Sequence, residues 1–301
     1  MLIARLFKNR NFIFILAFVL GFAIGDNLPW IRYLVVPALA IVMTVSMSEV
    51  NNRSFLPLKS ILKPAVFIFL LNYVLFSLIS LIPAYLLIED PELWKGFVII
   101  AASPAGVAIA PFTGIMGGDK AFSLKGVIIS HLLAILIIPI YGYLFIGVNF
   151  IQPIKLLILL AELIIAPFLV SRLILKLKVD KYILRFRGAL VNWGLFFVIF
   201  AVIALNRNYI FIYPKEAGIV ILIAFLAVFG TGLLMGLILK KLKILNKKRS
   251  SIILFSTVKN GGFAAAAALS LAGERASLPS ALISVVVIIY LIYLSFRSNS
   301  I

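Results

Sequence analysis

Three ionisable side chains lie inside apolar stretches of this sequence. His131 and Glu162 stand in the stretches 121–147 and 152–176, and Lys259 stands in "STVKNGG", residues 256–262. A charge at the centre of a bilayer costs on the order of 3 kcal/mol, so such residues usually face the protein interior and have a role. The histidine can titrate near neutral pH, the glutamate can neutralise a cation or relay protons, and the lysine can supply a tethered positive charge. Simpler alternatives are a packing histidine, a protonated interhelical carboxyl and a lysine that snorkels to an interface.

The chain that positions these residues is strongly apolar. Of its 301 residues 64% are hydrophobic, and the mean hydropathy is +1.20, whereas an average soluble domain is about half apolar. A segment of about 20 apolar residues can cross a bilayer as a helix. We therefore predict an all-α integral membrane protein without a soluble domain. The ten expected spans are 12–25, 31–48, 64–87, 96–116, 121–147, 152–176, 188–206, 216–239, 250–273 and 278–296.

The net charge of +18 follows a pattern of membrane topology rather than of nucleic-acid binding. With the N-terminus placed in the cytoplasm, 21 of the 28 Lys and Arg residues are assigned to cytoplasmic segments and six to outer links, and Lys259 is the one that the topology does not place. Such asymmetry is the positive-inside pattern. We predict a multi-pass protein of the cytoplasmic membrane with both termini inside, surrounded by the lipid bilayer and without a nucleic-acid partner. The oligomeric state stays open, with a monomer as one option.

Catalytic and metal chemistry are not indicated. The chain has no cysteine and one histidine, which excludes disulfides and thiolate ligands and argues against a metal cluster. "MGGDK", residues 116–120, partly matches the Gly-x-Gly-Asp of intramembrane aspartyl proteases, but Met116 takes the place of the first glycine and no second aspartate lies in a span. The zinc signature His-Glu-x-x-His is absent. We predict no catalytic residue, no metal and no cofactor, and the enzyme reading is set aside.

The two halves of the chain contain related small-residue stretches. "GVAIAPFTGIMGGDKA" (106–121) and "GGFAAAAALSLAGERA" (261–276) align at an offset of 155 residues, and both close on Gly, an acid, a base and Ala. They belong to the fourth and ninth expected spans, so the halves 1–148 and 149–301 are predicted to insert in opposite orientations. Inverted five-helix repeats of this kind are typical of secondary transporters.

Both stretches also contain helix breakers at matching depth, in "SPAGVAIAP" (103–111) and in "NGG" (260–262). Proline removes a backbone donor, and glycine leaves helical geometry easily. A broken span is tolerated where its backbone lines a cavity or meets protein, and a matched pair of broken spans points to a transport site. Kinked helices packed through small residues are the alternative. The predicted substrate-binding residues are Pro104, Ala105, Gly106, Asn260, Gly261 and Gly262.

These motifs carry a family resemblance. "SPAGVAIAPFTGIMGGDKAFS" and "VKNGGFAAAAALSLAGERASLPSAL" resemble the fourth and ninth helices of the bile acid:sodium symporter family, and the ten-span layout with cytoplasmic ends extends the resemblance over the whole chain. The resemblance implies a core domain in which the two broken helices cross near the midplane, and a smaller panel domain that moves against it. It implies an organic anion as substrate, such as a bile acid, a steroid sulfate or a small carboxylate. Relatives in the wider superfamily export arsenite.

The sequence departs from this family where the family binds sodium. The resemblance implies a glutamate and a glutamine in the ninth helix, and this chain has Phe255 and Lys259 at those positions. Fourth-helix ligands fall on Ile109 and Ala110, whose side chains cannot coordinate a cation. Sodium coupling is therefore doubtful, and the lysine is predicted to replace a bound cation.

The predicted function is alternating-access transport of a small organic anion, either independent of sodium or linked to protons through Lys259. Asn72 and Ser123 stand at positions that resemble further sodium contributors. The alternatives are a sodium-coupled symporter with a rearranged site, an exporter of arsenite or another anion, and a channel or receptor. The sequence leaves the substrate and the transport direction open. The candidate ion-coupling residues are Lys259, Asn72, Ser123, Glu162 and His131.

Overall fold

The computed structural model describes residues 9–25, 28–49, 59–147 and 153–298, and this part of the chain is helical without a β-strand. The helices of the first half are α2 (Arg10–Ile24), η2 (Pro29–Ile31), α3 (Arg32–Met47), α4 (Lys59–Ile68), η4 (Phe69–Leu75), α5 (Phe76–Leu87), α6 (Pro91–Ala102), α7 (Ile109–Ile115), α8 (Lys120–Tyr141) and η5 (Gly142–Ile146). Those of the second half are α9 (Pro153–Leu160), η7 (Ala161–Ile165), α10 (Ala166–Lys176), α11 (Asp180–Ile212), α12 (Pro214–Phe225), η8 (Leu226–Gly230), α13 (Thr231–Lys241), α14 (Asn246–Thr257), α15 (Gly261–Ala272) and α16 (Glu274–Ser298). The segments η4, η5, η7 and η8 are π-helical turns that continue neighbouring α-helices.

Seven helical runs in the described part of the chain are long and apolar enough to cross a bilayer. Large apolar side chains such as Leu86, Leu136 and Leu237 are exposed on them, which suits a lipid environment because lipid, unlike water, imposes no cost on an exposed apolar surface. The prediction of an all-α integral membrane protein is confirmed. The seven runs are Pro29–Met47, Pro64–Leu87, Phe122–Ile146, Ile154–Lys176, Arg185–Ile212, Pro214–Lys241 and Glu274–Leu294.

The other three expected spans have a different form. The first is the short apolar helix Phe12–Ile24. The fourth is divided into α6 and α7, and the ninth is divided into α14 and α15. Each half-helix is too short to span the hydrocarbon layer by itself. The two predicted interruptions are therefore present, at residues 103–108 and 258–260.

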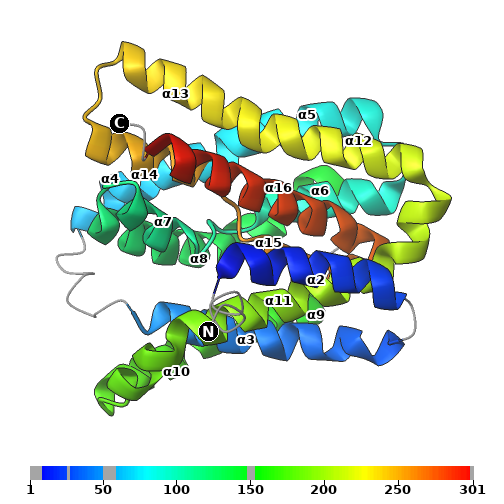
Figure 1. Cartoon of the computed structure of the whole chain (residues 1–301), viewed down its shortest axis with the longest axis horizontal. Coiled ribbons are helices and arrows are strands. Elements are labelled where there is room, and N and C mark those ends of the chain that lie inside the picture. The colour runs from blue at the N-terminus through cyan, green and yellow to red at the C-terminus, as the bar shows by residue number, and fades with distance from the viewer. Residues whose placement is uncertain (1–8, 26–27, 50–58, 148–152, 299–301) are drawn as a thin grey trace.

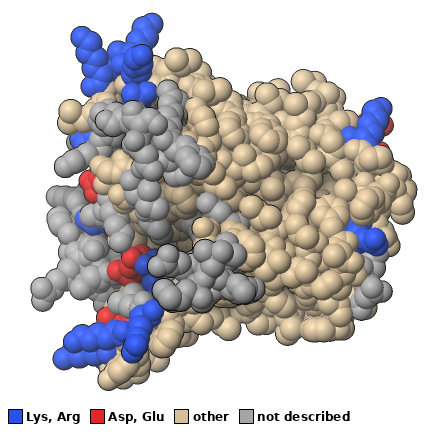
Figure 2. All heavy atoms as spheres, in the orientation of Figure 1, with Lys and Arg blue, Asp and Glu red and all other residues tan. Residues whose placement is uncertain are grey.

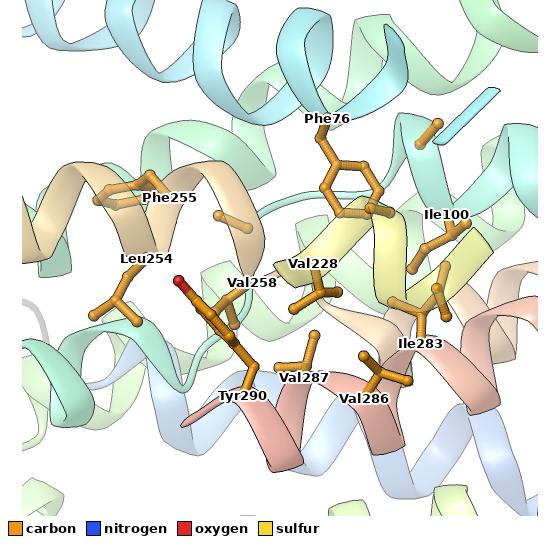
Figure 3. Packing of buried hydrophobic residues seen from close by; sticks show 14 of the residues in the cluster. Phe76, Ile100, Val228, Leu254, Phe255, Val258, Ile283, Val286, Val287 and Tyr290 are labelled. Atoms are coloured by element: carbon orange, nitrogen blue, oxygen red, sulfur yellow. The ribbon is translucent and has the colours of Figure 1, made fainter. Parts of the chain in front are cut away.

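The helices pack as two groups (Figure 1). In the first group α11 packs along α2 and α3, and α10 packs along α3. In the second group α16 packs against α6, α12 and α15. Figure 3 shows part of this second packing, where Tyr290 of α16 lies near Leu254 of α14 and near Val258, which directly follows α14. Helix α15 contributes to the hydrophobic clusters of both groups, so it lies where the groups meet.

Lysine and arginine side chains gather at one end of the molecule. Figure 2 shows them mainly at the left, where the turns between α10 and α11 and between α13 and α14 lie. Lys178 and Lys243 occupy left-handed backbone positions in these two turns, with φ of 56° and 53°. The opposite end carries few basic groups in this view. The basic leader at residues 1–8 lies outside the described residues.

Candidate functional site

The two helix interruptions bind each other through their backbones. The Gly106 N–H donates to the Val258 carbonyl at 2.9 Å, and the Asn260 N–H donates to the Pro104 carbonyl at 2.8 Å. Together these bonds form an isolated antiparallel bridge between Ala105 and Lys259. Backbone groups that leave a helix at membrane depth need partners within the protein. Each interruption supplies partners to the other, so the two breaks are mutually dependent.

This close approach explains why position 106 is a glycine. A Cβ on Gly106 would lie 2.9 Å from the Lys259 carbonyl oxygen and 2.9 Å from Val258 Cγ1. Two further amides at the breaks are also occupied, because the Ala105 N–H donates to Ser130 Oγ at 3.1 Å and the Gly261 N–H donates to the Lys259 carbonyl at 3.0 Å. A substrate could reach these amides only after their present hydrogen bonds had broken.

The Lys259 ammonium lies inside a cage of backbone oxygens. Its Nζ donates to the carbonyls of Asn72 at 2.9 Å, Ala101 at 2.8 Å and Ser103 at 2.5 Å, and the residue is 4% exposed. An ammonium group has three N–H donors. Because all three partners are acceptors, the protonated ammonium with its three hydrogens is the form that satisfies all of them. We call these three carbonyls the Lys259 cage.

Two aromatic rings complete the surroundings of this ammonium. Nζ lies 4.7 Å from the ring centroid of Tyr73 and 5.2 Å from that of Phe76. A cation within about 6 Å of an aromatic face is attracted by the negative charge density of that face. The charge is thus compensated by dipoles and ring faces, as a bound metal cation would be.

Local irregularities make the three carbonyls available. Helix α6 ends at Ala102, and the last carbonyls of a helix have no partner within it. The Ala105 N–H, which would bond to Ala101 if the helix continued, is turned to Ser130. In η4 the Phe76 N–H bonds to Leu71 instead of Asn72, and such π-turns are frequent at functional sites. The cage therefore results from one broken helix and one π-turn.

Asn260 links the second interruption to His131. Its side-chain oxygen caps α15 by accepting from the Phe263 N–H at 3.1 Å, so its amide nitrogen is the donor toward His131 Nε2 at 3.2 Å. His131 Nδ1 lies 2.7 Å from the Val127 carbonyl. Both contacts are satisfied by the neutral imidazole with its hydrogen on Nδ1. The histidine is 1% exposed and packs edge-on against Phe263 at 6.4 Å between ring centroids.

The other predicted ion-coupling residues divide between two places. The Asn72 side chain donates to the Ser103 carbonyl at 3.2 Å, next to the Lys259 cage. Ser123 is fully buried in a separate hydroxyl cluster, 2.8 Å from Thr113 Oγ1 and 3.2 Å from Ser251 Oγ. This cluster joins α7, α8 and α14.

A phenyl ring fills the neighbouring position where the family resemblance implies a glutamate. Phe255 is fully buried and packs edge-on against Phe122, with ring centroids 5.9 Å apart. Its ring lies against α8, where a Cβ on Gly126 would come within 2.3 Å of Phe255 Cζ. As a result, neither position 255 nor position 259 carries an anionic side chain.

Glu162, a candidate to neutralise a cation or to relay protons, does not contact Lys259 in this structure. Glu162 lies in the π-turn η7 and is exposed, and all three N–H donors of the lysine bond to backbone carbonyls. The sequence placed both residues inside spans, but it did not show which face of its helix the glutamate occupies.

Gly261 and Gly262 face neighbouring helices. A Cβ on Gly261 would lie 1.9 Å from Ser284 Oγ, and a Cβ on Gly262 would lie 3.0 Å from Leu195 Cδ2. Both glycines therefore permit close helix packing, which is the alternative reading of these small residues. Their contact with a substrate stays a prediction.

A small pocket lies beside the first interruption. Of the residues predicted at the site only His131 lines it. The sequence reasoning missed Glu49 and Arg187, which also line the pocket and form an ion pair. Glu49 and Arg187 are far apart in the sequence. The only sequence signal was that Glu49, an acidic residue, follows the expected span 31–48 at its cytoplasmic end, where basic residues were expected. The full lining is Met43, Ser46, Met47, Glu49, Val107, Ala110, Leu124, Val127, Ile128, His131 and Arg187.

Comparison with known families decides the class of this protein. The sequence profile of the sodium bile acid symporter family matches residues 36–213, which is more than half of the chain. The chain belongs to the sodium bile acid symporter family. Comparison with curated proteins gives no match. The matched range includes the first interruption, Asn72 and Ser123, and it ends before α14 and α15.

Membership of the sodium bile acid symporter family makes this protein a membrane transporter. The second interruption, which holds Lys259, lies outside the matched residues. Its relation to the first interruption therefore rests on the backbone bridge between them. This symporter family member thus combines a matched segment that holds the first break with a cationic side chain at the second break.

Proposed function

We propose that this protein is a ten-span secondary transporter that moves a small organic anion across the cytoplasmic membrane by alternating access. The halves 1–148 and 149–301 form inverted repeats, each with one broken helix. The observation that carries the proposal is the paired interruptions, with the Lys259 ammonium held by three backbone carbonyls. Broken helices at corresponding places in two halves are where transporters of this type bind substrate and coupling ion.

The two packing groups supply the moving parts. The group with α2, α3, α10 and α11 corresponds to a panel domain, and the group around α16 corresponds to a core domain that contains both interruptions. The pocket lies between them, because α3 and α11 contribute one wall while residues 107–110 and α8 contribute the other. A substrate between two mobile groups is the arrangement that alternating access requires.

The end of the molecule opposite the basic residues is closed by contacts between the two groups. Arg32 of α3 forms an ion pair with Glu274 of α16 at 3.1 Å. In addition, Asn206 of α11 donates to Ser277 Oγ of α16 at 3.0 Å, and Tyr209 of α11 donates to a carboxylate oxygen of Asp90 at 3.3 Å. We call these contacts the outer latch.

The open pocket defines the conformation. Its residue Arg187 lies in the first turns of α11, next to the turn between α10 and α11 at the basic end. The outer latch joins the starts of α3 and α16, which lie at the other end (Figure 1). Basic residues mark the cytoplasmic side of membrane proteins. The structure therefore supports an inward-facing state with both termini in the cytoplasm.

In this proposal the side chain of Lys259 takes the place of the coupling ion. Lys259 supplies a cation at the place where the family resemblance implies a sodium-binding glutamine, and Phe255 removes the glutamate that would balance a second charge. The ammonium is fully hydrogen-bonded in the inward-facing state. Proton release would therefore require loss of at least one of these bonds during the transport cycle.

A transport assay distinguishes a carrier from a channel. We expect a screen of small carboxylates and sulfonates to identify anions that raise the apparent melting temperature of the purified protein, because a ligand of the native state stabilises it. In proteoliposomes these anions should show saturable counterflow that is unchanged when sodium is replaced by choline. Ohmic single-channel currents, or counterflow that depends on sodium, would contradict the proposal.

Locking the outer latch should stop transport. The chain has no cysteine, so the pair Arg32→Cys and Glu274→Cys can be joined by a short bis-methanethiosulfonate, which forms a disulfide with each introduced thiol. We expect the cross-linked protein to lose most of its counterflow, because the panel cannot leave the core on the outer side, and to regain it after reduction. The two single variants treated with the same reagent are the controls. Full counterflow by the cross-linked protein would show that this end does not open.

A further inference from the structure

The turn after α10 has a lysine in a backbone position that usually holds glycine. The Val179 N–H donates to the Ile174 carbonyl and the Lys178 N–H donates to the Leu175 carbonyl, both at 3.2 Å. This pair of bonds defines a Schellman motif, in which the first residue beyond the helix cap is left-handed. Here that residue is Lys178, with φ of 56°. A side chain is strained in this conformation because its Cβ approaches the following carbonyl oxygen, and glycine avoids the strain.

The turn after α13 repeats this arrangement. The Ile244 N–H donates to the Leu239 carbonyl and the Lys243 N–H donates to the Lys240 carbonyl, both at 3.1 Å. Lys243 has φ of 53°. Among the described residues other than glycine, the lysines of these two turns are the ones with positive φ. The same strained residue type therefore closes both helices, although glycine would close them without strain.

The helix dipoles do not account for the two strained lysines. Positive charge is favourable in the last turn of a helix, and Lys176 already stands there in α10, as Lys240 and Lys241 do in α13. Lys178 and Lys243 follow the helix ends, and both side chains are exposed. Because backbone strain is typically kept where a residue has a function, the charge of these lysines points to a partner outside the chain.

Other basic side chains surround the strained lysines. Figure 2 shows lysine and arginine side chains projecting from two places at one end, which in Figure 1 are the turns between α10 and α11 and between α13 and α14. The stretches 172–187 and 240–249 contain one acidic residue, Asp180. Such clusters next to membrane spans attract anionic lipid headgroups. The exposed basic side chains, four at each turn, are Lys176, Lys178, Lys181, Arg185, Lys240, Lys241, Lys243 and Lys248.

Exposed apolar side chains stand among these charges. Leu177 lies between two lysines and is 62% exposed, and Leu242, at the same place in the other turn, is 63% exposed. Tyr182 and Phe186 of α11 are exposed as well. At a bilayer surface leucine side chains reach the acyl chains while lysine ammonium groups stay at the headgroups, and aromatic rings favour the same level. A soluble polyanion would leave these apolar side chains in water, so the pattern favours a lipid surface.

We propose that the two turns bind anionic phospholipid headgroups of the cytoplasmic leaflet, in the orientation proposed above. The basic turns, as we call residues 174–187 and 239–249, offer their ammonium groups to lipid phosphates beyond the helix ends. Lys178 and Lys243 take part because their left-handed backbone carries the chain past the last helical turn, and the leucine before each of them faces the acyl chains. One turn joins α10 to α11 and the other joins α13 to α14, so each packing group has its own contact with the leaflet.

The apparent melting temperature of the purified full-length protein in dodecyl maltoside tests the proposal. We expect dioleoyl phosphatidylglycerol to raise it by several degrees more than dioleoyl phosphatidylcholine, because a ligand of the native state stabilises that state. This excess should shrink in about 1 M sodium chloride, where charges are screened within about 3 Å. Soluble glycerol 1-phosphate should give no such excess, which distinguishes a lipid surface from a free phosphate.

The double variant Lys178→Gly and Lys243→Gly separates the charge from the backbone. Without lipid it should melt at the wild-type temperature or above it, because glycine relieves the strain. Its excess in phosphatidylglycerol should fall by about a quarter or more, since two of the eight exposed basic side chains are gone. The matched control, Lys155→Gln with Lys215→Gln, removes two exposed lysines from the opposite end and should keep the full excess.

Each other result overturns the proposal. It fails if both lipids raise the melting temperature equally, if glycerol 1-phosphate matches the lipid, if the glycine variant keeps the full excess, or if the control loses as much. Lysines that serve topology alone would give the third of these results. If the glycine variant does not fold, Lys178→Asn with Lys243→Asn decides by the same comparison, because asparagine tolerates the left-handed conformation. The measurement involves no transport, so its failure would leave the proposed transport function standing.

Discussion

Lys259→Met is expected to destabilise the protein strongly while it still inserts into the membrane. Methionine has a similar length but no N–H donor, so the carbonyls of Asn72, Ala101 and Ser103 would stay buried without the ammonium. An unpaired buried polar group costs about 1–3 kcal/mol. The Ser103 carbonyl keeps the Asn72 side chain as a donor, so two carbonyls are left unpaired, and we expect a loss of at least about 2 kcal/mol. The apparent melting temperature of the purified variant measures this, with size-exclusion chromatography as the check of folding.

A second substitution at the same position tests whether the ammonium stands for a cation. Lys259→Gln removes the charge but keeps the oxygen cage, so the space can accept a metal cation. We expect sodium chloride, compared with choline chloride, to raise the melting temperature of this variant and to leave the wild type unchanged. The pH profile of counterflow should also change. A sodium-dependent gain in the wild type, or variants that melt and transport as the wild type does, would show that the lysine does not replace a cation.

Gly96→Ala should produce the second large effect. Gly96 lies on α6 where this helix meets α16, and an added Cβ would come within 2.2 Å of the Ala276 carbonyl oxygen and 2.9 Å of Pro279 Cγ. The nearest atom belongs to the backbone, so the two helices must separate. Overpacking of this kind costs about 1–3 kcal/mol, and occasionally more. Because α6 ends at the Lys259 cage, transport should fall together with the melting temperature.

Gly236→Ala is the matched control for this prediction. Gly236 lies on α13, and an added Cβ would meet nothing within 4 Å. Alanine is the better helix former by up to about 1 kcal/mol, so this variant should melt at the wild-type temperature or slightly above it. Equal destabilisation of the two variants would show that contact with α16 is not the cause.

The sequence by itself determined the membrane class, the placement of most spans and the position of both interruptions. These properties depend on local chemistry. A run of apolar residues partitions into lipid wherever it occurs in a chain, and the helix breakers around Pro104 and Asn260 act on their own backbone. Lys259 could also be singled out from the sequence, because it was the one basic residue that the topology did not place. The inverted repeat stays a prediction, since its support is sequence similarity and the pairing of the breaks.

Only the tertiary structure decided what these residues contact. The oxygens of the Lys259 cage come from a π-turn and a helix end that are distant in the sequence, and their availability depends on where neighbouring amides point. The same holds for the exposed side chain of Glu162 and for the pairing of Glu49 with Arg187 across the pocket. Hydropathy and helix breaking are properties of a segment, whereas the partner of a charge depends on which helices pack together and on how each is rotated about its axis.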